Sequence, residues 1–583
     1  MNEQAILLAS SDGLSPQDCN LGKLLDFFGI SWRTSTVTEL FADHNGTNQV
    51  GLRLLCASDH LSTLLRGLEQ NPDRARRWRE QIHSVFAYAG KDIAALGRLA
   101  EIEAGQNPFG ERRPYSGQFE VSDKLPEFCG IMAGIRIAAE DAEVDLLFAS
   151  APHSRHVEII SLNHGAAFVR LESEGVPVFL CSSRSIIDIE SDLPDGIFDL
   201  RQHVLQALPP VLYIKWAFAE TCWAAPEKSA CLIIDDPLLK PRYGFVDYRE
   251  LLSLMQRYKF STNIAFIPWN WRRSDSGVTR LFRENPEYYS ISVHGCAHTR
   301  AEFGSDDSEH LYAKTRQALE RMDQHEATTG LAHDRVMVFP QGVFSEAAMR
   351  ILKRTDLIAA VNNDTISSNS NPRAITVADV WDTAIMAYDN FPLFTRRYPR
   401  SGIENFAFDS LLDKPVVIVV HHGSCRDHCG RLIAFIERLN ALACPLRWRS
   451  LGELVRRSCR QRALSDDVTQ VEMYGKELRI ENLSNRTKQF LIRRRERDSS
   501  TIMEVRVGSN PVAWTYRGDR IQFEVELKGG EHTTIRLDFH ELDEAKETAE
   551  SLNYTARTML RRYLCEWRDN YLHKLTSLSS NGN

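Results

Sequence analysis

The sequence lacks several features that would have assigned it to a well-defined class. No apolar stretch approaches the ~20 residues that a membrane-spanning helix needs, so we expect no transmembrane segment. Basic residues are not in excess, since 70 Lys and Arg stand against 78 Asp and Glu, for a formal net charge of −8. General binders of nucleic acid or anionic membranes carry the opposite imbalance, so we expect neither as a general partner. The glycine fingerprint of dinucleotide sites and the P-loop are also missing.

The amino terminus and the cysteines indicate a compartment. Residues Ala5–Ala9 form a short apolar run without the positive charges that open a signal peptide, which predicts a first strand there. The twelve cysteines are scattered without a repeating framework, a pattern typical of reduced thiols rather than disulfides. We therefore expect a cytoplasmic protein. Cys425, His428 and Cys429 lie close in sequence, but without a second ligand pair they are expected to be ordinary packing.

The composition is that of a globular protein, and the length is enough for several domains. Hydrophobic residues make up 43% of the 583 residues and charged residues 25%, which excludes disorder and low-complexity repeats. We predict a multidomain α/β protein. Its expected parts are an N-terminal α/β domain (1–115), a strand-rich accessory α/β segment (116–225), a central (β/α) barrel (226–462), a small antiparallel β-sandwich (463–540) and an amphipathic helix with a tail (541–583).

Two sequence patterns support the division of residues 1–225 into two parts. Residues 1–115 alternate apolar runs with helical patterns, including a helix near 93–104, which predicts a largely parallel sheet. Residues 116–225 are richer in strand signals, one of them at 145–149. Neither segment discloses a function.

The central segment is a series of short, fully apolar strands followed by helices or polar loops. Such strands are buried on both faces and indicate a (β/α) barrel or a close relative of it. The predicted strands are Cys231–Ile234, Ile264–Ile267, Ser290–Val293, Val336–Phe339, Ile358–Val361 and Val416–Val420, and the predicted helices are Asp247–Tyr258, Ser308–Glu326 and Ser345–Thr355.

The last residues predict a long amphipathic helix over about 543–574, with apolar residues three or four apart. Its polar face mixes both charge signs, whereas a membrane-surface helix prefers Lys and Arg. We therefore expect it to pack on its own chain or to join a homo-oligomer. The basic run Arg493–Arg497 lies in a strand-like stretch and is expected to be a solvated face.

Polar side chains follow the central strands where barrel active sites are built. Asp235 and Asp236 come directly after the strand Cys231–Ile234. The backbone turns at such a strand exit, so both carboxylates can face one cavity with different roles. The alternative is that one Asp caps the turn before Pro237.

Two histidines follow the strand that ends at Val293. His294 and His298 are four residues apart, the spacing at which two imidazoles on one side of a helical turn coordinate one metal ion. With one Asp they would form a two-histidine, one-carboxylate site with open positions for water and substrate. We predict metal binding here.

A third strand, Val416–Val420, is followed by His421 and His422. Imidazole titrates near neutral pH, so a histidine at this strand end is suited to act as a general acid. We expect one of the pair to face the cavity and assign this role to His421, with His422 at the substrate or in a structural position.

Together these residues resemble the NodB-homology domain of the polysaccharide deacetylases, carbohydrate esterase family 4, over about residues 228–455. The resemblance implies Asp235 as general base, His421 as general acid, and a divalent metal held by Asp236, His294 and His298. The run Val338–Ser345 is similar to the family's third motif, which shapes the groove wall. This similarity implies that Pro340 and Gln341 contact the substrate.

Two positions depart from the family pattern. The family usually has Ser or Thr after the first metal histidine, and this chain has Gly295. The third motif usually carries an arginine that orients the catalytic aspartate, and the matching residue is Val338. We expect Arg335 or another arginine to substitute for it.

The predicted chemistry is amide hydrolysis at an N-acetylated sugar. A divalent ion lowers the pKa of a bound water towards about 7, and nitrogen and oxygen ligands fit Zn²⁺, although Fe, Co or Ni could occupy such a site. After one barrel strand, Trp269, Trp271 and Arg272 are suited to hold a sugar ring and an acidic group, unless the tryptophans pack beneath the loop. Alternatives are hydrolysis of another C–N or glycosidic bond, or carbohydrate binding without turnover.

Overall fold

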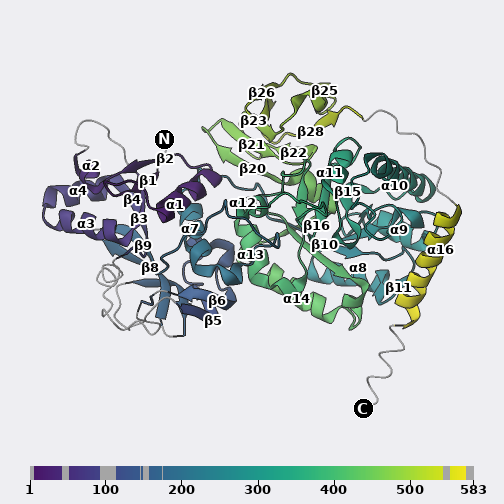
Figure 1. The fold of residues 1–583 in the computed structure, drawn as a ribbon, viewed down its shortest axis with the longest axis horizontal. Helices are drawn as coiled ribbons and strands as arrows, with labels where there is room; N and C mark the ends of the chain where they lie inside the picture. Colours follow the sequence, from purple (N-terminus) through teal and green to yellow (C-terminus); the bar gives the residue numbers. More distant parts are fainter. Residues whose placement is uncertain are drawn as a thin grey trace, which may run out of the picture. The chain divides into compact units, whose positions relative to one another are not determined.

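The computed structural model describes residues 5–42, 51–91, 113–144, 146–148, 156–163, 165–173, 175–541 and 552–572 (Figure 1). The chain divides into two compact units. The first holds residues 1–191, 198–223 and 442–444, and the second holds residues 192–197, 224–441 and 445–583. We call them the N-terminal unit and the site unit.

The N-terminal unit is built on a nine-stranded sheet in the order β2-β1-β3-β4-β9-β8-β7-β5-β6. The neighbours from β2 to β9 are parallel, as predicted, and the remaining pairs are antiparallel. Strands from both sides of residue 115 therefore share one sheet. The predicted helix at 93–104 and both ends of the predicted strand at 145–149 lie outside the described residues. The strands are β1 (Ala5–Leu8), β2 (Trp32–Ser35), β3 (Leu52–Ala57), β4 (Ile82–Tyr88), β5 (Arg113–Val121), β6 (Arg136–Val144), β7 (Val157–Leu162), β8 (Gly165–Ser173) and β9 (Val176–Cys181).

Helices of the N-terminal unit follow the parallel strands. Helix α1 begins after Ser15, which forms a capping box with Asp18 and is followed by a proline in the first turn, so the sequence itself marks the helix start. The helices of this unit are α1 (Pro16–Phe27), α2 (Val37–Ala42), α3 (Ser58–Glu69), α4 (Pro72–Gln81), α6 (Pro126–Cys129) and α7 (Val204–Ala217).

The site unit contains a parallel sheet in the order β17-β16-β15-β14-β13-β10-β18, with β19 (Arg447–Trp448) on β10. All its pairings are parallel, and the strands are buried as their apolar sequences predict. A bridge joins Arg397, just after β17, to Ile418 of β18 at the other end of the path. Full closure into a barrel stays a prediction. The strands are β10 (Ser229–Asp235), β13 (Thr262–Phe266), β14 (Tyr289–Val293), β15 (Asp334–Val338), β16 (Ala359–Asn362), β17 (Leu393–Thr395) and β18 (Val416–His421).

The three helices predicted for this region are present, each opened by a side chain that accepts a backbone N–H. They are α8 (Tyr248–Tyr258) after Asp247, α10 (Ser308–Thr329) after Asp307 and α11 (Glu346–Lys353) after Ser345. Further helices are α9 (Ser276–Glu284), α12 (Val377–Trp381), α13 (Ile403–Leu411), α14 (Gly430–Asn440) and α15 (Leu451–Arg457).

Two small sheets follow, ordered β20-β21-β23-β27-β26 and β22-β28-β24-β25, with a shared apolar core. The prediction of purely antiparallel pairing is wrong at one place, since β21 and β23 are parallel. The strand between them, β22, pairs in the other sheet, so the chain returns in the same direction. The bounds are β20 (Cys459–Ala463), β21 (Val468–Met473), β22 (Glu477–Glu481), β23 (Lys488–Arg495), β24 (Ile502–Val507), β25 (Asn510–Pro511), β26 (Thr515–Arg517), β27 (Arg520–Leu527) and β28 (His532–Phe539).

The basic run in β23 is not a uniformly solvated face, contrary to the prediction. Arg494 is 0% exposed and donates to Glu496, at 2.7 Å, and to the carbonyl of Asn390. Glu496 also accepts from buried Lys353 of α11 at 2.6 Å. Because side chains alternate along a strand, Arg494 points inward while its neighbours Arg493 and Arg495 stay partly exposed.

The C-terminal helix α16 (Leu552–Trp567) continues into a π-helical turn over Arg568–Leu572. The remainder of the predicted helix, residues 543–551 and 573–574, lies outside the described residues. Within the described parts of the chain, every helix is too short or too polar to span a bilayer.

Candidate metal centre

Two adjacent carboxylates stand at the carboxyl end of β10. Asp235 is the last residue of the strand, and Asp236 follows it with a φ of 81°. A non-glycine residue in this left-handed region is uncommon and costs backbone strain. The turn separates the two side chains, so that Asp236 faces the histidines while Asp235 faces Arg396.

The two histidines come from the loop after β14. The prediction that they share a helical turn is wrong, because this segment is a loop and His298 has a φ of 55°. The buried His294 lies 2.8 Å through Nδ1 from the carbonyl oxygen of Val338. A carbonyl only accepts hydrogen bonds, so Nδ1 carries a proton and Nε2 is the nitrogen that faces Asp236.

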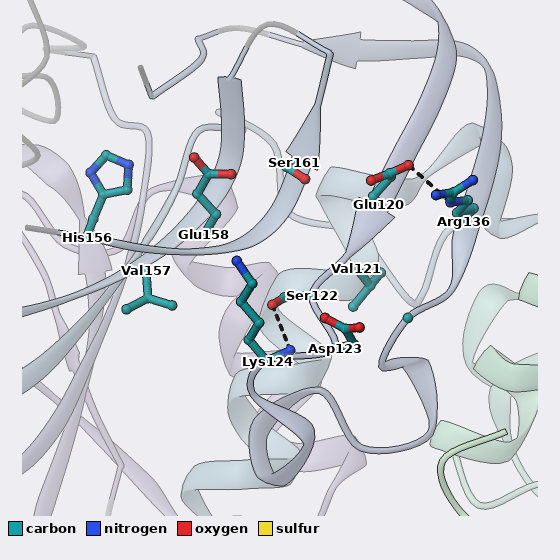
Figure 2. Close-up of a pocket in the computed structure, with 11 residues that line it drawn as sticks. Glu120, Val121, Ser122, Asp123, Lys124, Arg136, His156, Val157, Glu158 and Ser161 are labelled. Carbon is teal, nitrogen blue, oxygen red and sulfur yellow. Dashed lines mark hydrogen bonds and ion pairs between the residues drawn. The ribbon is translucent and has the colours of Figure 1, made fainter. Parts of the chain in front are cut away.

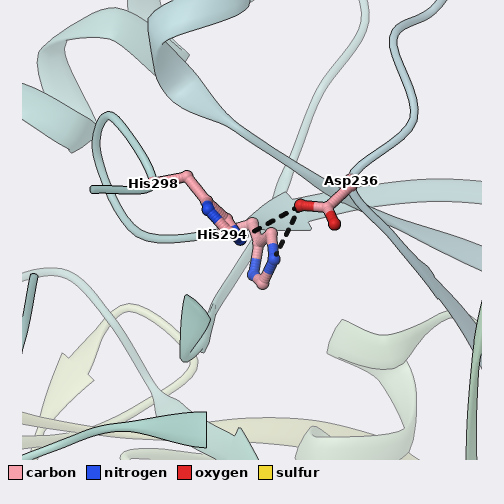
Figure 3. Close-up of side chains that lie close together, drawn as sticks. All are labelled: Asp236, His294 and His298. Carbon is pink, nitrogen blue, oxygen red and sulfur yellow. Dashed lines mark ion pairs between the residues drawn. The ribbon is translucent and has the colours of Figure 1, made fainter. Parts of the chain in front are cut away.

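The three side chains converge. One ligand atom from each of Asp236, His294 and His298 lies within 4.8 Å of the other two (Figure 3). Oδ1 of Asp236 is 3.5 Å from Nε2 of His294 and 3.1 Å from Nε2 of His298. Among the described residues this buried oxygen has no hydrogen-bond partner. A carboxylate oxygen and imidazole nitrogens aimed at one point fit a divalent cation.

The electrostatics of the cluster also favour a cation. Burial alone would raise the pKa of Asp236, but the imidazoles of His294 and His298 outweigh it and hold that pKa well below its ordinary value. Burial lowers the pKa of His294. The carboxylates of Asp235 and Asp236 raise this pKa by more than burial lowers it, so the net effect is a rise. Two carboxylates therefore act on the same small volume.

Glu302 braces the histidine loop, and the sequence analysis missed it. Its buried carboxylate accepts the backbone N–H groups of Cys296 and Ala297, both at 2.9 Å, and of His298 at 3.0 Å. These three hydrogen bonds hold the backbone of the loop between Cys296 and His298 in place. The only signal in the sequence was an acidic residue a few positions after the second histidine.

Replacing Glu302 by glutamine should weaken metal binding by about 10- to 100-fold, the usual effect of losing a group that orients metal ligands. The amide keeps the size but loses the charge and one acceptor oxygen. Titration of the metal-free protein with zinc measures the affinity. Glu309→Gln, at an exposed position of α10, is the matched control, and equal affinities for the two variants would refute the bracing role.

Gly295 is required by its backbone. Its φ is 65°, and a Cβ there would lie 2.7 Å from Oε2 of Glu302 and 2.8 Å from Cγ of Pro340. The family's Ser or Thr cannot occupy this position without moving one of them.

We expect Gly295→Ser to lower the free energy of unfolding by about 1–3 kcal/mol, through the left-handed φ and the overlap. Thermal unfolding measures the change. Gly423→Ser is the matched control, since a Cβ at Gly423 meets nothing within 4 Å. If both variants unfold at the parent temperature, the loop is not constrained as described.

An arginine does hold Asp235, but it is neither at position 338 nor at 335. Nη1 of Arg396, which follows β17, donates to Oδ1 of Asp235 at 2.7 Å, and both side chains are buried. Arg335 lies at the opposite end of its strand and pairs with Glu477 of β22. Sequence spacing could not identify Arg396, because β17 is only three residues long.

The two histidines at the end of β18 differ in environment: His421 is its last residue, and His422 follows it. His421 is exposed, is the register partner of Asp235, and has its ring 6.2 Å from the ring of Tyr398. His422 is largely buried, with rings of Tyr243 and Phe245 beside it and Asp569 3.7 Å away. His421 is therefore the more exposed of the two side chains.

The predicted substrate residues are spread around the metal loop. Trp269 donates its backbone N–H to Cys296 of that loop, and its ring contacts Tyr563 of α16. The guanidinium of exposed Arg272 lies over the ring of half-buried Trp271. Pro340 is buried against Gly295, and the side chain of exposed Gln341 accepts from the backbone N–H of Ala301 at 3.3 Å.

Cys425 and Cys429 form a disulfide, so the expectation of reduced thiols throughout is wrong for this pair. A tight turn before α14 brings their Cα atoms to 3.9 Å. His428 between them pairs with Glu250 instead of joining a metal cluster.

A separate hollow of about 530 Å³ lies in the N-terminal unit (Figure 2). It is polar and carries both charge signs, with Lys124 and Glu158 on its wall and an ion pair of 3.1 Å between Arg136 and Glu120. Among the described residues, the one cluster of metal-ligating side chains is in the site unit.

The fold and the site define a multidomain α/β protein with a candidate Asp/His/His metal centre at the carboxyl edge of a parallel sheet. No family model and no curated protein matches the chain. Solved structures that resemble it include the Xyl-CE4 domain of a multidomain xylanase from the hindgut metagenome of Trinervitermes trinervoides, with 12% identity, 39% of this chain and 89% of that chain covered, and a TM-score of 0.25.

Two further structures match to the same degree. A family 4 acetyl xylan esterase from Clostridium thermocellum, in complex with a cobalt ion, is 12% identical over 39% of this chain and 90% of its own, with a TM-score of 0.25. A family 4 carbohydrate esterase from Streptomyces lividans, in complex with acetate, is 12% identical over 38% and 93%, with a TM-score of 0.24. At these values the likeness carries no argument, and the geometry of the site has to support any function.

Proposed function

We propose that the chain is a metal-dependent hydrolase that removes an N-acetyl group from an amino sugar in a glycan or glycan precursor, as the carbohydrate esterase family 4 deacetylases do. The observation that carries the proposal is the convergence of Asp236, His294 and His298 within 4.8 Å, next to Asp235 held by Arg396. A second carboxylate beside a metal centre is what a hydrolytic site needs as a base.

The residues divide the work as follows. A divalent ion, zinc by the nature of the donor atoms, would supply an acidified water molecule and polarise the amide carbonyl. Asp235 takes the proton of the attacking water, and Arg396 holds its carboxylate in position through a hydrogen bond of 2.7 Å. His421, on the neighbouring strand, donates a proton to the departing amine as the C–N bond breaks. The products are acetate and a free amino sugar.

Sugar recognition is proposed for Trp271 and Arg272. They combine an aromatic face with a cation, a combination suited to a sugar ring that carries an acidic group. Gln341 would add a polar contact from the other side of the metal loop. Trp269 has part of its surface taken by Tyr563.

The test is a screen of N-acetylated sugars, nucleotide sugars and oligosaccharides for released acetate, with and without a chelator. We expect acetate release that the chelator abolishes and added zinc restores. New reducing ends without acetate would indicate cleavage of a glycosidic bond instead. Sugar binding with a retained metal ion but no turnover would replace the hydrolase by a binding protein.

A further inference from the structure

The outward face of α16 and its π-helical turn is apolar and largely exposed among the described residues, although the ring of Tyr563 also contacts Trp269 and Arg273. Its large side chains are between 49% and 61% exposed. In chain order they are Met559, Leu560, Tyr563, Leu564, Trp567 and Tyr571. A contiguous exposed face of this kind marks a surface for docking.

The two acidic residues of the described helix point the other way, into the chain. Glu566 pairs with Lys240, after β10, and with Arg273, after β13. Asp569 accepts from the hydroxyl of Tyr243 at 2.8 Å and lies 3.7 Å from His422. The structure thus separates the mixed charges of the sequence, because both carboxylates are used to attach the helix to its own chain.

Asp569 is held as an anion in this position. Burial raises its pKa, but hydrogen bonds with His422, Arg568 and Tyr243 outweigh that effect and lower the pKa to about 2. The backbone N–H of Gly244 donates to the side chain of Asn570 at 2.7 Å. The end of α16 is therefore fixed beside β11 (Arg242–Tyr243), as Figure 1 shows.

Arginines remain on the outside. Arg557 is exposed and Arg561 half-exposed, four residues apart and so on one side of the helix. Arg568 contacts Asp569 at 2.8 Å, yet its side chain is 57% exposed. The outward surface thus combines aromatic and aliphatic side chains with arginines, which is the composition of helices that lie in the interface of an anionic membrane.

We propose that α16 docks the protein on an anionic lipid surface, with its apolar stripe in the interface and Arg557, Arg561 and Arg568 at the headgroups. The net charge of −8 of the whole chain does not oppose this, since exposed charges farther away than about 8 Å are largely screened at physiological salt. The helix touches the loops after β10, β13 and β18. Docking would therefore place the mouth of the candidate site near the headgroups.

A second copy of the chain is the other occupant to consider. In a symmetric pair of α16 helices, the arginines of the two copies would lie near each other beside one apolar stripe, and their like charges would repel. Lipid phosphates, in contrast, attract these arginines. The charges of the outward face thus favour lipid over a partner chain. The inference is independent of the proposed deacetylase activity.

The test is co-sedimentation of the full-length protein with vesicles of phosphatidylcholine and with mixed phosphatidylcholine–phosphatidylglycerol vesicles. We expect binding to the mixed vesicles only. Leu564→Ser/Trp567→Ser should lower it by about tenfold or more, the effect of two side chains no longer buried. Arg557→Gln/Arg561→Gln should also weaken it. The matched control is Leu483→Ser/Met503→Ser, which alters exposed apolar residues elsewhere and should bind like the parent.

Failure of the parent to bind mixed vesicles would overturn the proposal, and so would equal binding to both lipids. A concentration-dependent dimer in sedimentation velocity, lost in Leu564→Ser/Trp567→Ser and not accompanied by vesicle binding, would assign the face to a second copy and overturn it too. Because the altered side chains are exposed, the variants should keep the parent's thermal unfolding curve.

Discussion

Asp235→Asn should lower turnover by about 10³-fold while the bound metal stays in place. The carboxylate is the proposed general base, and such a group contributes roughly 10²- to 10⁴-fold. It does not belong to the converging triad, since its partner is Arg396 rather than the histidines. The measurement pairs acetate release with the metal content of the same sample.

Acetate release and metal content respond differently to changes at the two adjacent aspartates. Asp236→Asn replaces the adjacent residue by the same chemistry and should lose metal and turnover together, because Asp236 supplies a ligand atom. If Asp235→Asn turns over at the parent rate, the roles of the two carboxylates are wrongly assigned. Loss of metal in Asp235→Asn would equally contradict the account.

Arg396→Gln should have the second largest effect, on both stability and turnover. It leaves the buried carboxylate of Asp235 without its cation, and breaking one partner of a buried pair costs about 3–5 kcal/mol. A base that is no longer held in position should also lower kcat, with little change in KM. Thermal unfolding and steady-state acetate release measure the two effects.

Two further variants control for a general loss of folding. Arg335→Gln removes an arginine of the same sheet that pairs with Glu477, far from the site, and should leave kcat unchanged. In Asp235→Asn/Arg396→Gln neither charge is left unpaired, so stability should recover in part while turnover does not. Recovery of turnover in the double variant, or an unchanged kcat in Arg396→Gln, would show that Arg396 does not position the base.

The parallel sheet and the triad could be predicted from sequence because their signals are local. Fully apolar strands of four or five residues predict a buried parallel sheet. Asp236, His294 and His298 lie in the segments that follow two of these strands, so they are expected at the same edge of the sheet. The helices were equally accessible where a capping residue opens them, as Asp247 does for α8.

The supporting residues could not be predicted, because their contacts depend on the three-dimensional path of the chain. Arg396 follows a strand too short to leave a pattern, and it reaches Asp235 from 161 residues away. Glu302 acts through three backbone N–H groups in a loop that the spacing of His294 and His298 had suggested to be helical. Left-handed backbone at Asp236 and His298 carries no sequence signal, since neither residue is glycine.

The sequence also could not predict which charged side chains point into the protein and which point to the surface. The inward position of Arg494 depends on Glu496 and on a carbonyl from another part of the site unit. On α16, only the contacts of Glu566 and Asp569 reveal that its acidic side chains face inward. The amino-acid composition counts charges of both signs, whereas the outward face of the described part of this helix carries mainly arginines.

The central claim is that Asp236, His294 and His298 hold one divalent ion, and its most direct test is the metal content of purified protein after loading with zinc and removal of excess. The account predicts about one equivalent per chain for the parent, removable by a chelator, and less than about a tenth of that for His294→Ala and for Asp236→Asn/His298→Ala. Equal metal content in the parent and these variants, or no bound metal in a folded parent, would contradict it.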